Sequence, residues 1–117
     1  MAATLSGKER LSGKTAIAVL MNRGRWSQTL HLRCCCLADN GLEFNRIMVS
    51  VPKRLYKRAV KRNLLKRRMR EAYRQNKELT GPGGRDILFV YNHPEIAPYA
   101  EICDELCSLL RTLPGRK

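Results

Sequence analysis

No apolar stretch of this chain approaches the roughly 18 residues that a helix needs to cross a bilayer. The opening residues, MAATLSGKERL, also lack the apolar core of a secretory signal peptide, and no lipidation or retention signal is visible. These absences argue against a membrane partner. We therefore expect a cytoplasmic protein.

Acidic residues and histidines are scarce, which argues against an active site made by the protein alone. The chain has ten Asp and Glu residues and two histidines. Glu101, Asp104 and Glu105 fit the solvent-exposed face of a helix better than a metal-binding cluster. His31 lies within a predicted strand and His93 before a proline, so nothing in the sequence brings them together for metal-free RNA cleavage. We assign no catalytic residue, and the metal ligands stay unknown.

The five cysteines do not follow the pattern of a disulfide framework or of a zinc site. Cys34, Cys35 and Cys36 are consecutive, while Cys103 and Cys107 lie one helical turn apart. An odd number with three neighbours pairs poorly into disulfides, and a zinc site needs two suitably spaced pairs. We expect buried thiols that act as small apolar side chains.

The chain does contain enough apolar residues for one modest core. Its 117 residues are 44% apolar, which is typical of a single folded domain over residues 1–117, and we expect flexible tails at residues 1–9 and 114–117. Ser12 is the expected N-cap of a first helix, and Gly24 is placed to end it. Periodicity predicts three helices and three strands, with helices at residues 11–23, 57–77 and 99–113 and strands at residues 26–37, 46–51 and 86–92.

The connections predict how these elements pack. Asn40-Gly41 is a typical hairpin turn, so the first two strands should pair, while the mostly apolar third strand should be central. Residues 81–84 should form a loop. The strand–helix–strand unit around the second helix requires a crossover between parallel strands, which general rules predict to be right-handed. Helices on one face of such a mixed sheet make a two-layer α+β sandwich whose other face stays partly open.

Positive charge is concentrated in residues 53–74, which hold eleven of the 23 Lys and Arg residues and a single acid, Glu71. At about 100° per residue, this helix has an apolar face made of Leu65, Met69, Ala72 and Tyr73. The opposite face is a polar stripe made of Asn63, Lys66, Arg67, Arg70 and Arg74. A solvent-exposed helix face normally mixes charge signs, so the stripe indicates binding to a polyanion such as nucleic acid. Asn63 is either a helix cap or a contact residue.

Residues 62–73, RNLLKRRMREAY, resemble the signature helix of the bacterial ribonuclease P protein component. Ala59-Val60 precede this segment, as in the family. The resemblance covers most of the chain, because the first helix, the strand before the basic segment, the apolar strand at residues 87–91 and the final helix also fall in place. A match of this length with the correct flanking elements is specific.

Two departures from the family pattern concern its contact residues. Leu64 stands where the family commonly has a second arginine after Asn63, so one cationic contact is missing. Ile17 and Met21 stand where the family often has phenylalanines, so apolar packing replaces aromatic stacking of a single strand on the first helix.

The resemblance implies a fold with one more strand than periodicity predicts. It implies an α+β fold, a two-layer α/β sandwich of the ribosomal-protein-S5-domain-2-like type. The expected order is αβββαβα, with a mixed four-stranded sheet and a left-handed crossover in place of the right-handed one that general rules predict.

The resemblance also implies a role as the protein subunit of a ribonucleoprotein endoribonuclease, which removes the 5′ leader from precursor tRNA. The RNA subunit would carry the Mg²⁺-dependent chemistry, and the protein, a monomer in the holoenzyme, would raise substrate affinity. The expected contacts to the RNA subunit are Arg58, Lys61, Arg62, Asn63, Lys66, Arg67, Arg70 and Arg74. The expected contacts to the leader are Ile17, Met21, Lys53 and Arg54. The alternative is a general or ribosomal RNA-binding protein without a role in tRNA processing.

Overall fold

The computed structural model describes residues 9–80 and 83–113. The elements along this part of the chain are α1 (Lys14–Arg23), β1 (Arg25–Gln28), β2 (Leu32–Leu37), β3 (Arg46–Ser50), α2 (Ala59–Asn76), the 3-10 helix η2 (Lys77–Thr80), β4 (Asp86–Tyr91) and α3 (Tyr99–Arg111). The αβββαβα order and the mixed four-stranded sheet are therefore confirmed. Residues 1–8 of the tail predicted at 1–9, the whole tail predicted at 114–117, and residues 81–82 of the predicted loop lie outside the described residues. Within the described ranges, no helix combines the length and the apolar character needed to cross a bilayer.

Helix α1 starts later than expected and ends as expected. Gly13 occupies the N-cap position with φ of 96°, and no side chain caps the helix, so the prediction of Ser12 as the cap is wrong. At the other end, the Gly24 N–H donates to the Leu20 carbonyl at 2.7 Å. A Cβ atom on Gly24 would lie 2.6 Å from Cys35 Sγ, so this close approach to β2 requires glycine.

The residues before α1 run along the edge of the sheet. The Leu11 N–H donates to the Ile47 carbonyl at 2.7 Å, which ties this segment to β3. Glu9, which we expected in a flexible tail, forms an ion pair with Lys77 in which Oε2 and Nζ lie 3.1 Å apart. Residue 9 is therefore part of the folded domain.

The strands lie in the order β1-β2-β4-β3, with β4 central as expected. β2 is antiparallel to both β1 and β4, and β3 is parallel to β4. The predicted hairpin at Asn40-Gly41 is wrong, because β4 lies between β2 and β3. Positive φ angles occur at Asp39 (61°) and Gly41 (81°) rather than at Asn40. The Asn40 side chain instead donates to Asp86 Oδ1 at 2.9 Å and holds the loop against β4.

The predicted strand at residues 26–37 is broken into β1 and β2 by a tight turn. The Thr29 N–H donates to the Leu32 carbonyl at 2.8 Å, and Leu30 is 72% exposed. Glu105 of α3 holds this turn, since its Oε1 accepts bonds from Thr29 Oγ1 at 2.5 Å and from the His31 N–H at 2.8 Å. The alternation of apolar residues continues through the turn, so the sequence pattern alone does not reveal the break.

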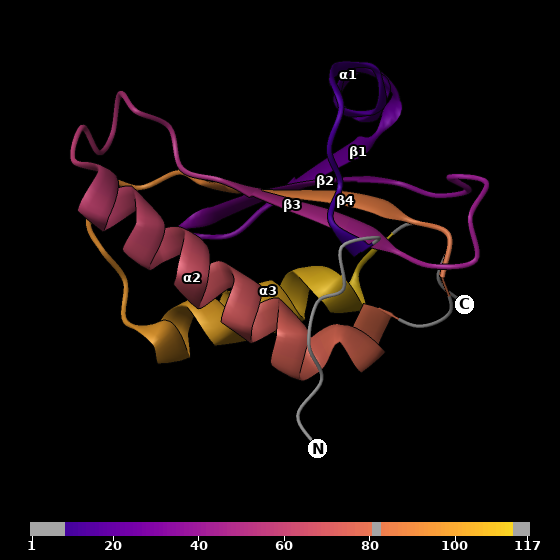
Figure 1. Cartoon of the computed structure of the whole chain (residues 1–117). Helices are drawn as coiled ribbons and strands as arrows, with labels where there is room; N and C mark the ends of the chain where they lie inside the picture. The colour runs from indigo at the N-terminus through magenta and orange to yellow at the C-terminus, as the bar shows by residue number, and fades with distance from the viewer. Residues whose placement is uncertain (1–8, 81–82, 114–117) are drawn as a thin grey trace.

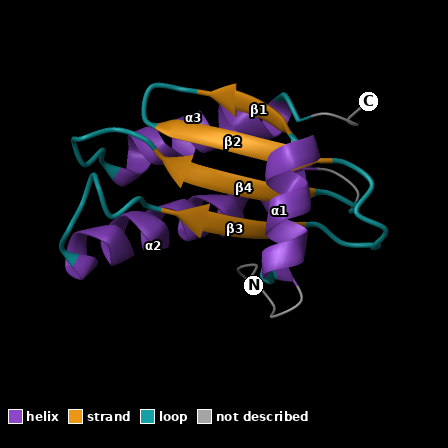
Figure 2. Cartoon of the chain, turned by 90° about the horizontal axis from the view of Figure 1, so that it is seen from above, coloured by secondary structure: helices purple, strands orange, loops and turns teal. Residues whose placement is uncertain are grey.

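Helices α2 and α3 cover one face of the sheet, and α1 lies on the other (Figure 1). In the part of the chain that the structure describes, twenty buried residues form the main core on the α2–α3 face. The α1 face has a smaller cluster of four buried residues, Leu11, Leu20, Cys35 and Leu88. Helix α1 crosses only one end of the strands (Figure 2), so the rest of its face remains open, as expected.

The cysteines are free thiols, and they contribute to the apolar clusters on both faces of the sheet. Cys34 and Cys36 belong to the main core and Cys35 to the α1 cluster, while Cys107 is buried and Cys103 half-buried. Burial raises the pKa of Cys36 to about 12 and also raises that of Cys34. The interpretation of the consecutive cysteines as small apolar side chains is confirmed.

The crossover between β3 and β4 is left-handed. Figure 2 views the sheet from the α1 side, with α2 behind it and with β3 and β4 both running toward the left. The chain leaves β3 at the left, passes behind the sheet through α2, and enters β4 at the right, on the inner side of β3. This path has the hand that the family resemblance implied, and the right-handed expectation from general rules is wrong here.

Candidate nucleic-acid interface

Helix α2 is oriented by its apolar face. Leu65, Met69, Ala72 and Tyr73 are all buried, as predicted, so the opposite face must point away from the core. The polar and cationic side chains on that outer face are exposed or half-exposed, and they are Asn63, Lys66, Arg67, Arg70 and Arg74. Lys61 is also exposed, but it lies in the first turn, one turn before the buried Leu65 and on the same side of the helix. The predicted stripe is therefore present on a rigid helix of 18 residues.

A surface groove of about 810 Å³ follows this stripe. Its lining is mostly cationic or polar and consists of Arg10, Val60, Asn63, Leu64, Arg67, Arg70, Glu71 and Arg74. A second hollow, of about 300 Å³, lies where α2 meets the edge of the sheet, and Arg10, Lys66 and Arg70 all line it. Sequence reasoning did not assign Arg10, because only the pairing of its segment with β3 brings it beside α2.

The acid in the groove is neutralised within the protein. Glu71 Oε1 accepts a bond from Arg74 Nε at 2.8 Å, and Gln75 donates to Oε2 at 2.9 Å. The bond from Arg74 lowers the pKa of Glu71, so this carboxylate stays ionised and paired. Among the described residues, no carboxylate pairs with Arg67 or Arg70. These two guanidinium groups are thus available to an anion.

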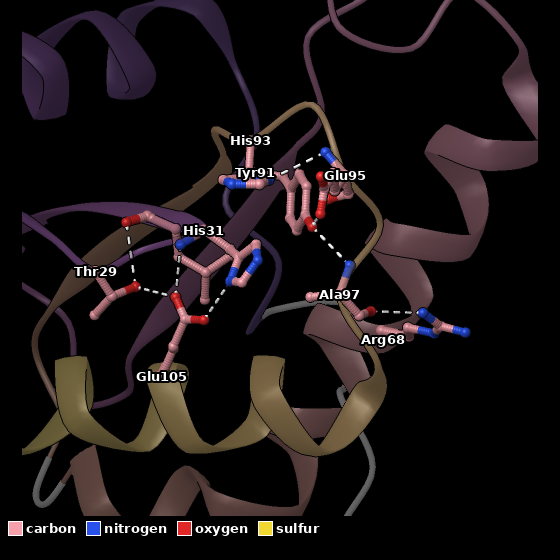
Figure 3. Close-up of polar contacts among 9 residues, drawn as sticks. Thr29, His31, Arg68, Tyr91, His93, Glu95, Ala97 and Glu105 are labelled. Atoms are coloured by element: carbon pink, nitrogen blue, oxygen red, sulfur yellow. Dashed lines mark hydrogen bonds and ion pairs between the residues drawn. The ribbon is translucent and has the colours of Figure 1, made fainter.

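Two other arginines of α2 brace the protein itself. Arg62 Nη1 donates to the carbonyls of Tyr56 and Lys57, each at 2.7 Å, and so holds the segment that leads into α2. Arg68 Nη1 donates to the Ala97 carbonyl at 2.7 Å and ties α2 to the segment before α3 (Figure 3). We expected Arg62 to be a simple RNA contact, but it also has this structural role.

The start of α2 excludes one of the two interpretations of Asn63. Arg58 is the N-cap residue, and no side chain makes a cap bond there. Asn63 lies further along the helix, is exposed and lines the groove, so its role as a cap is excluded. Among the described residues no side chain caps the start of α2, which lies beside Arg58 and Lys61, an arrangement that favours an anion.

The four residues predicted to contact the leader do not form one cluster. Ile17 packs against the α1 cluster, and Met21 is 50% exposed. Lys53 and Arg54 are exposed in the connection between β3 and α2, at the opposite end of the strands from α1 (Figure 2). The open part of the α1 face lies between the two pairs, so a ligand that reaches both must be extended.

An aromatic group on this open face was missed by sequence reasoning. Trp26 of β1 is 39% exposed, and Arg33 Cζ lies 4.5 Å from the centre of its ring. Trp26 pairs with Cys35, which belongs to the α1 cluster, so Trp26 stands on the α1 face. One unbroken strand over residues 26–37 would have placed it on the other face. The turn at residues 29–31 reverses that assignment.

The expectation that His31 and His93 stay apart is wrong. Their rings lie 4.4 Å apart between centroids, because Leu32 of β2 pairs with Tyr91 of β4 and so brings the ends of these strands together (Figure 3). His31 is 6% exposed, and its Nδ1 lies 2.6 Å from Glu105 Oε2. Rings in van der Waals contact leave no space for a phosphate between them, so this pair has a packing role.

Glu105 is likewise not on the solvated face of α3 that we expected. Its side chain is 16% exposed and sits beneath the turn between β1 and β2 (Figure 3). Burial alone would raise its pKa, but the bonds from Thr29 and His31 outweigh that cost and lower it. Within the described ranges, no group of three or more His, Cys, Asp or Glu residues is placed to hold a metal ion.

Comparisons with known proteins agree with this geometry. The model of the Ribonuclease P family matches residues 5–114. The ribonuclease P protein component of Syntrophus aciditrophicus (strain SB) is 31% identical over 111 residues, which cover 95% of this chain and 92% of that protein. The solved RNase P protein from Thermotoga maritima superimposes with a TM-score of 0.80 at 26% identity and covers 92% of this chain and 99% of its own. The Staphylococcus aureus RNase P protein has the same fold, with a TM-score of 0.77 at 20% identity. The chain therefore belongs to the family of bacterial ribonuclease P protein components.

Proposed function

We propose that this protein binds the ribonuclease P RNA subunit through α2 and the 5′ leader of precursor tRNA across the open α1 face. In this way it supports the removal of the leader that leaves the mature 5′ end of the tRNA. The observation that carries the proposal is the outer face of α2, where Arg67 and Arg70 lie without a carboxylate partner among the described residues, beside Arg10 in one groove.

The expected contacts to the RNA subunit fall into groups according to their positions on α2. Lys66 and Arg67 lie on one turn of the outer face and Arg70 on the next, an arrangement that suits phosphates along a folded RNA backbone. Arg58 and Lys61 add charge at the start of the helix, and Asn63 supplies an amide that can donate to phosphate or accept from a base edge. If six to eight phosphates are neutralised, log affinity falls with log salt at a slope of roughly −5 to −7. Arg62 and Arg74 contribute mainly by holding neighbouring groups in place.

The leader would lie in an extended conformation over the open sheet face. Ile17 and Met21 belong to α1, which crosses one end of this face, and Lys53 and Arg54 belong to the connection between β3 and α2 at the other end (Figure 2). Apolar groups at one end and cations at the other fit a single strand, whose bases can pack against apolar side chains and whose phosphates need positive charge. This path keeps the leader on a different side of the sheet from α2.

Mg²⁺ would supply the catalytic chemistry from sites made by the RNA subunit and the substrate. The described residues include no carboxylate cluster of the kind that holds Mg²⁺, so the donor groups of this part of the chain do not fit a protein-held ion. Its cations would instead reduce the repulsion between the two RNA molecules, and metal ions would then bind the assembled complex at lower concentration. We place this role in the cytoplasm, with one protein monomer in each holoenzyme.

A cleavage assay separates this proposal from its alternatives. Purified protein is mixed with precursor tRNA at low Mg²⁺ concentration, with and without the RNA subunit. Cleavage that requires both components supports the proposal. RNA binding without stimulated cleavage favours a general or ribosomal RNA-binding protein, and cleavage by the protein alone would refute an accessory role.

A further inference from the structure

We infer that Trp26 and Arg33 form a stacking platform for an unpaired base of the leader, an inference that rests on the proposed binding of the leader to the α1 face. Within residues 9–80 and 83–113, Trp26 is the one exposed large aromatic side chain. Its ring is held by the Arg33 guanidinium, 4.5 Å from the ring centre. A flat, half-exposed aromatic group next to a planar cation is the surface on which unpaired bases stack.

Strand register places this pair on the open face. Trp26 pairs with Cys35, and Gln28 pairs with Arg33. Arg33 and Cys35 alternate with the buried core residues of β2, so both stand on the α1 side, and Trp26 stands with them. Arg33 in turn pairs with Val90, and Val90 with Ser50 of β3. A row of side chains thus runs across all four strands, over about 14 Å, from the platform toward Lys53 and Arg54.

The positive charge near Trp26 indicates that the ligand of the platform is a nucleic acid strand. The segment from Arg23 to Leu37 contains Arg23, Arg25 and Arg33 and no acidic residue. A phosphate next to the stacked base would meet the Arg33 guanidinium of β2, whereas Arg25 of β1 pairs with Cys36 of the main core and stands on the other face of the sheet. An acidic or apolar peptide would leave the ring–guanidinium pair without a planar partner. Helix α1 offers no aromatic ring, because its sequence is KTAIAVLMNR. Trp26 is therefore the residue on which a base would stack on this face.

The emission of Trp26 reports on the platform directly, because Trp26 is the only tryptophan of the chain. The holoenzyme, reconstituted with the RNA subunit, is titrated with precursor tRNA that has an unstructured leader, and separately with mature tRNA. We expect the precursor to quench the emission and the mature tRNA to leave it unchanged. Equal emission with both RNAs, while the precursor binds more tightly, would overturn the platform and leave the proposed function standing. Equal affinity for both RNAs would refute leader binding itself.

Substitutions separate stacking from simple apolar contact. We expect Trp26→Ala and Trp26→Leu to weaken precursor binding by about tenfold, and Trp26→Phe to retain most of the affinity. Arg33→Lys keeps the charge but loses the planar group, so it should weaken precursor binding in the same direction by a smaller factor. Binding of mature tRNA and of the RNA subunit should not change in any of these variants.

A matched control is Leu42→Ala, which removes an apolar side chain that is 37% exposed in the loop between β2 and β3. It should leave precursor binding unchanged. Circular dichroism melts confirm that each variant is folded. If Trp26→Leu and Trp26→Phe bind the precursor equally well, apolar contact alone accounts for Trp26 and the stacking platform is refuted.

Discussion

The two faces of the sheet are made from the same four strands but differ in how much they bury. Against α2 and α3 the strands bury a core of twenty residues, whereas against α1 they bury a cluster of four. The free energy of burial grows with the apolar area removed from water, so the α2–α3 face supplies most of the stability. The α1 face can therefore exchange contacts with a ligand without unfolding the protein.

The two interior strands show the origin of this difference. Phe89 and Tyr91 of β4 are buried on the α2–α3 face, while Val90 between them is only half-buried on the other. The residue paired with Val90 is Arg33 of β2, a charged side chain stacked on Trp26. Because a charged group and a half-exposed valine occupy the middle of the α1 face, no second layer of helices closes over it.

The largest expected effect comes from shortening one apolar side chain on each face of the sheet and comparing the losses of stability. Leu106→Ala removes a fully buried side chain from the main core and should lower the free energy of unfolding by about 2–5 kcal/mol. Ile17→Ala, on the half-buried surface of α1, should cost about 1 kcal/mol. Urea unfolding followed by circular dichroism measures both, with the 80%-exposed Val60→Ala as a control that should stay within about 0.5 kcal/mol of the parent. Equal losses for Leu106 and Ile17 would contradict the asymmetry.

A smaller effect is expected where α3 reaches the turn between β1 and β2. Glu105→Gln replaces a carboxylate that accepts bonds from Thr29 and His31, and it should cost about 1–3 kcal/mol at neutral pH. Because the bonds from Thr29 and His31 in the folded protein lower the pKa of Glu105 below its ordinary value, its stabilisation is present above that ordinary pKa and is lost as the pH falls through the lowered pKa. The variant should therefore lose less stability on acidification than the parent.

The matched control for Glu105 is Glu101→Gln, which removes an exposed carboxylate from the same helix. It should leave both the stability at pH 7 and its acid dependence nearly unchanged. Urea unfolding at a series of pH values measures these quantities. An identical pH dependence in the parent and in Glu105→Gln would show that the bonds to this carboxylate do not hold the turn.

Local sequence pattern predicted the features of the fold that depend on residues close in the sequence. It failed for features that depend on contacts between distant residues. The buried and exposed faces of α2 follow from helical spacing, and the alternation of Cys34, Cys35 and Cys36 follows from strand geometry. The break at residues 29–31 was missed, because it depends on a carboxylate 76 residues further along the chain than Thr29. The central place of β4 was expected, but its insertion between β2 and β3 in place of the predicted hairpin was missed for the same reason.

The residues of the candidate interface also fall into those that local sequence pattern predicted and those that depend on contacts between distant segments. The stripe of Arg67 and Arg70 follows from spacing alone and was predicted. The contribution of Arg10 was not, because it requires the chain before α1 to lie against β3. The bracing role of Arg62 requires two carbonyls of the preceding segment to converge on its guanidinium. Trp26 was missed because the turn after β1 reverses the face on which it stands.

Adjacent residues of α2 allow stability and binding to be separated. Met69 is fully buried and Arg70 is exposed in the groove. Arg70→Ala should weaken binding to the RNA subunit and make the slope of log affinity against log salt shallower by about 1, with stability unchanged within about 0.5 kcal/mol. Met69→Ala should lower the free energy of unfolding by about 2–5 kcal/mol and leave the salt slope unchanged in the folded fraction. An Arg70 variant with the parent's slope would remove this residue from the interface.

The smallest expected effect is a difference in the rates at which a reagent labels the cysteine thiols, with no change in the native structure. Under native conditions a thiol reagent should label the half-buried Cys103 first, since the other four thiols are buried. Among the consecutive cysteines, Cys35 should follow before Cys34 and Cys36, because opening the four-residue α1 cluster costs less free energy than opening the main core. Burial also raises the pKa of Cys36 to about 12, so this thiol reacts only from opened molecules. Iodoacetamide labelling followed by fragmentation mass spectrometry resolves the three positions. Equal rates at Cys34, Cys35 and Cys36 would mean that the two faces open together, and α1 would then be an integral part of the core rather than a layer that can move for a ligand.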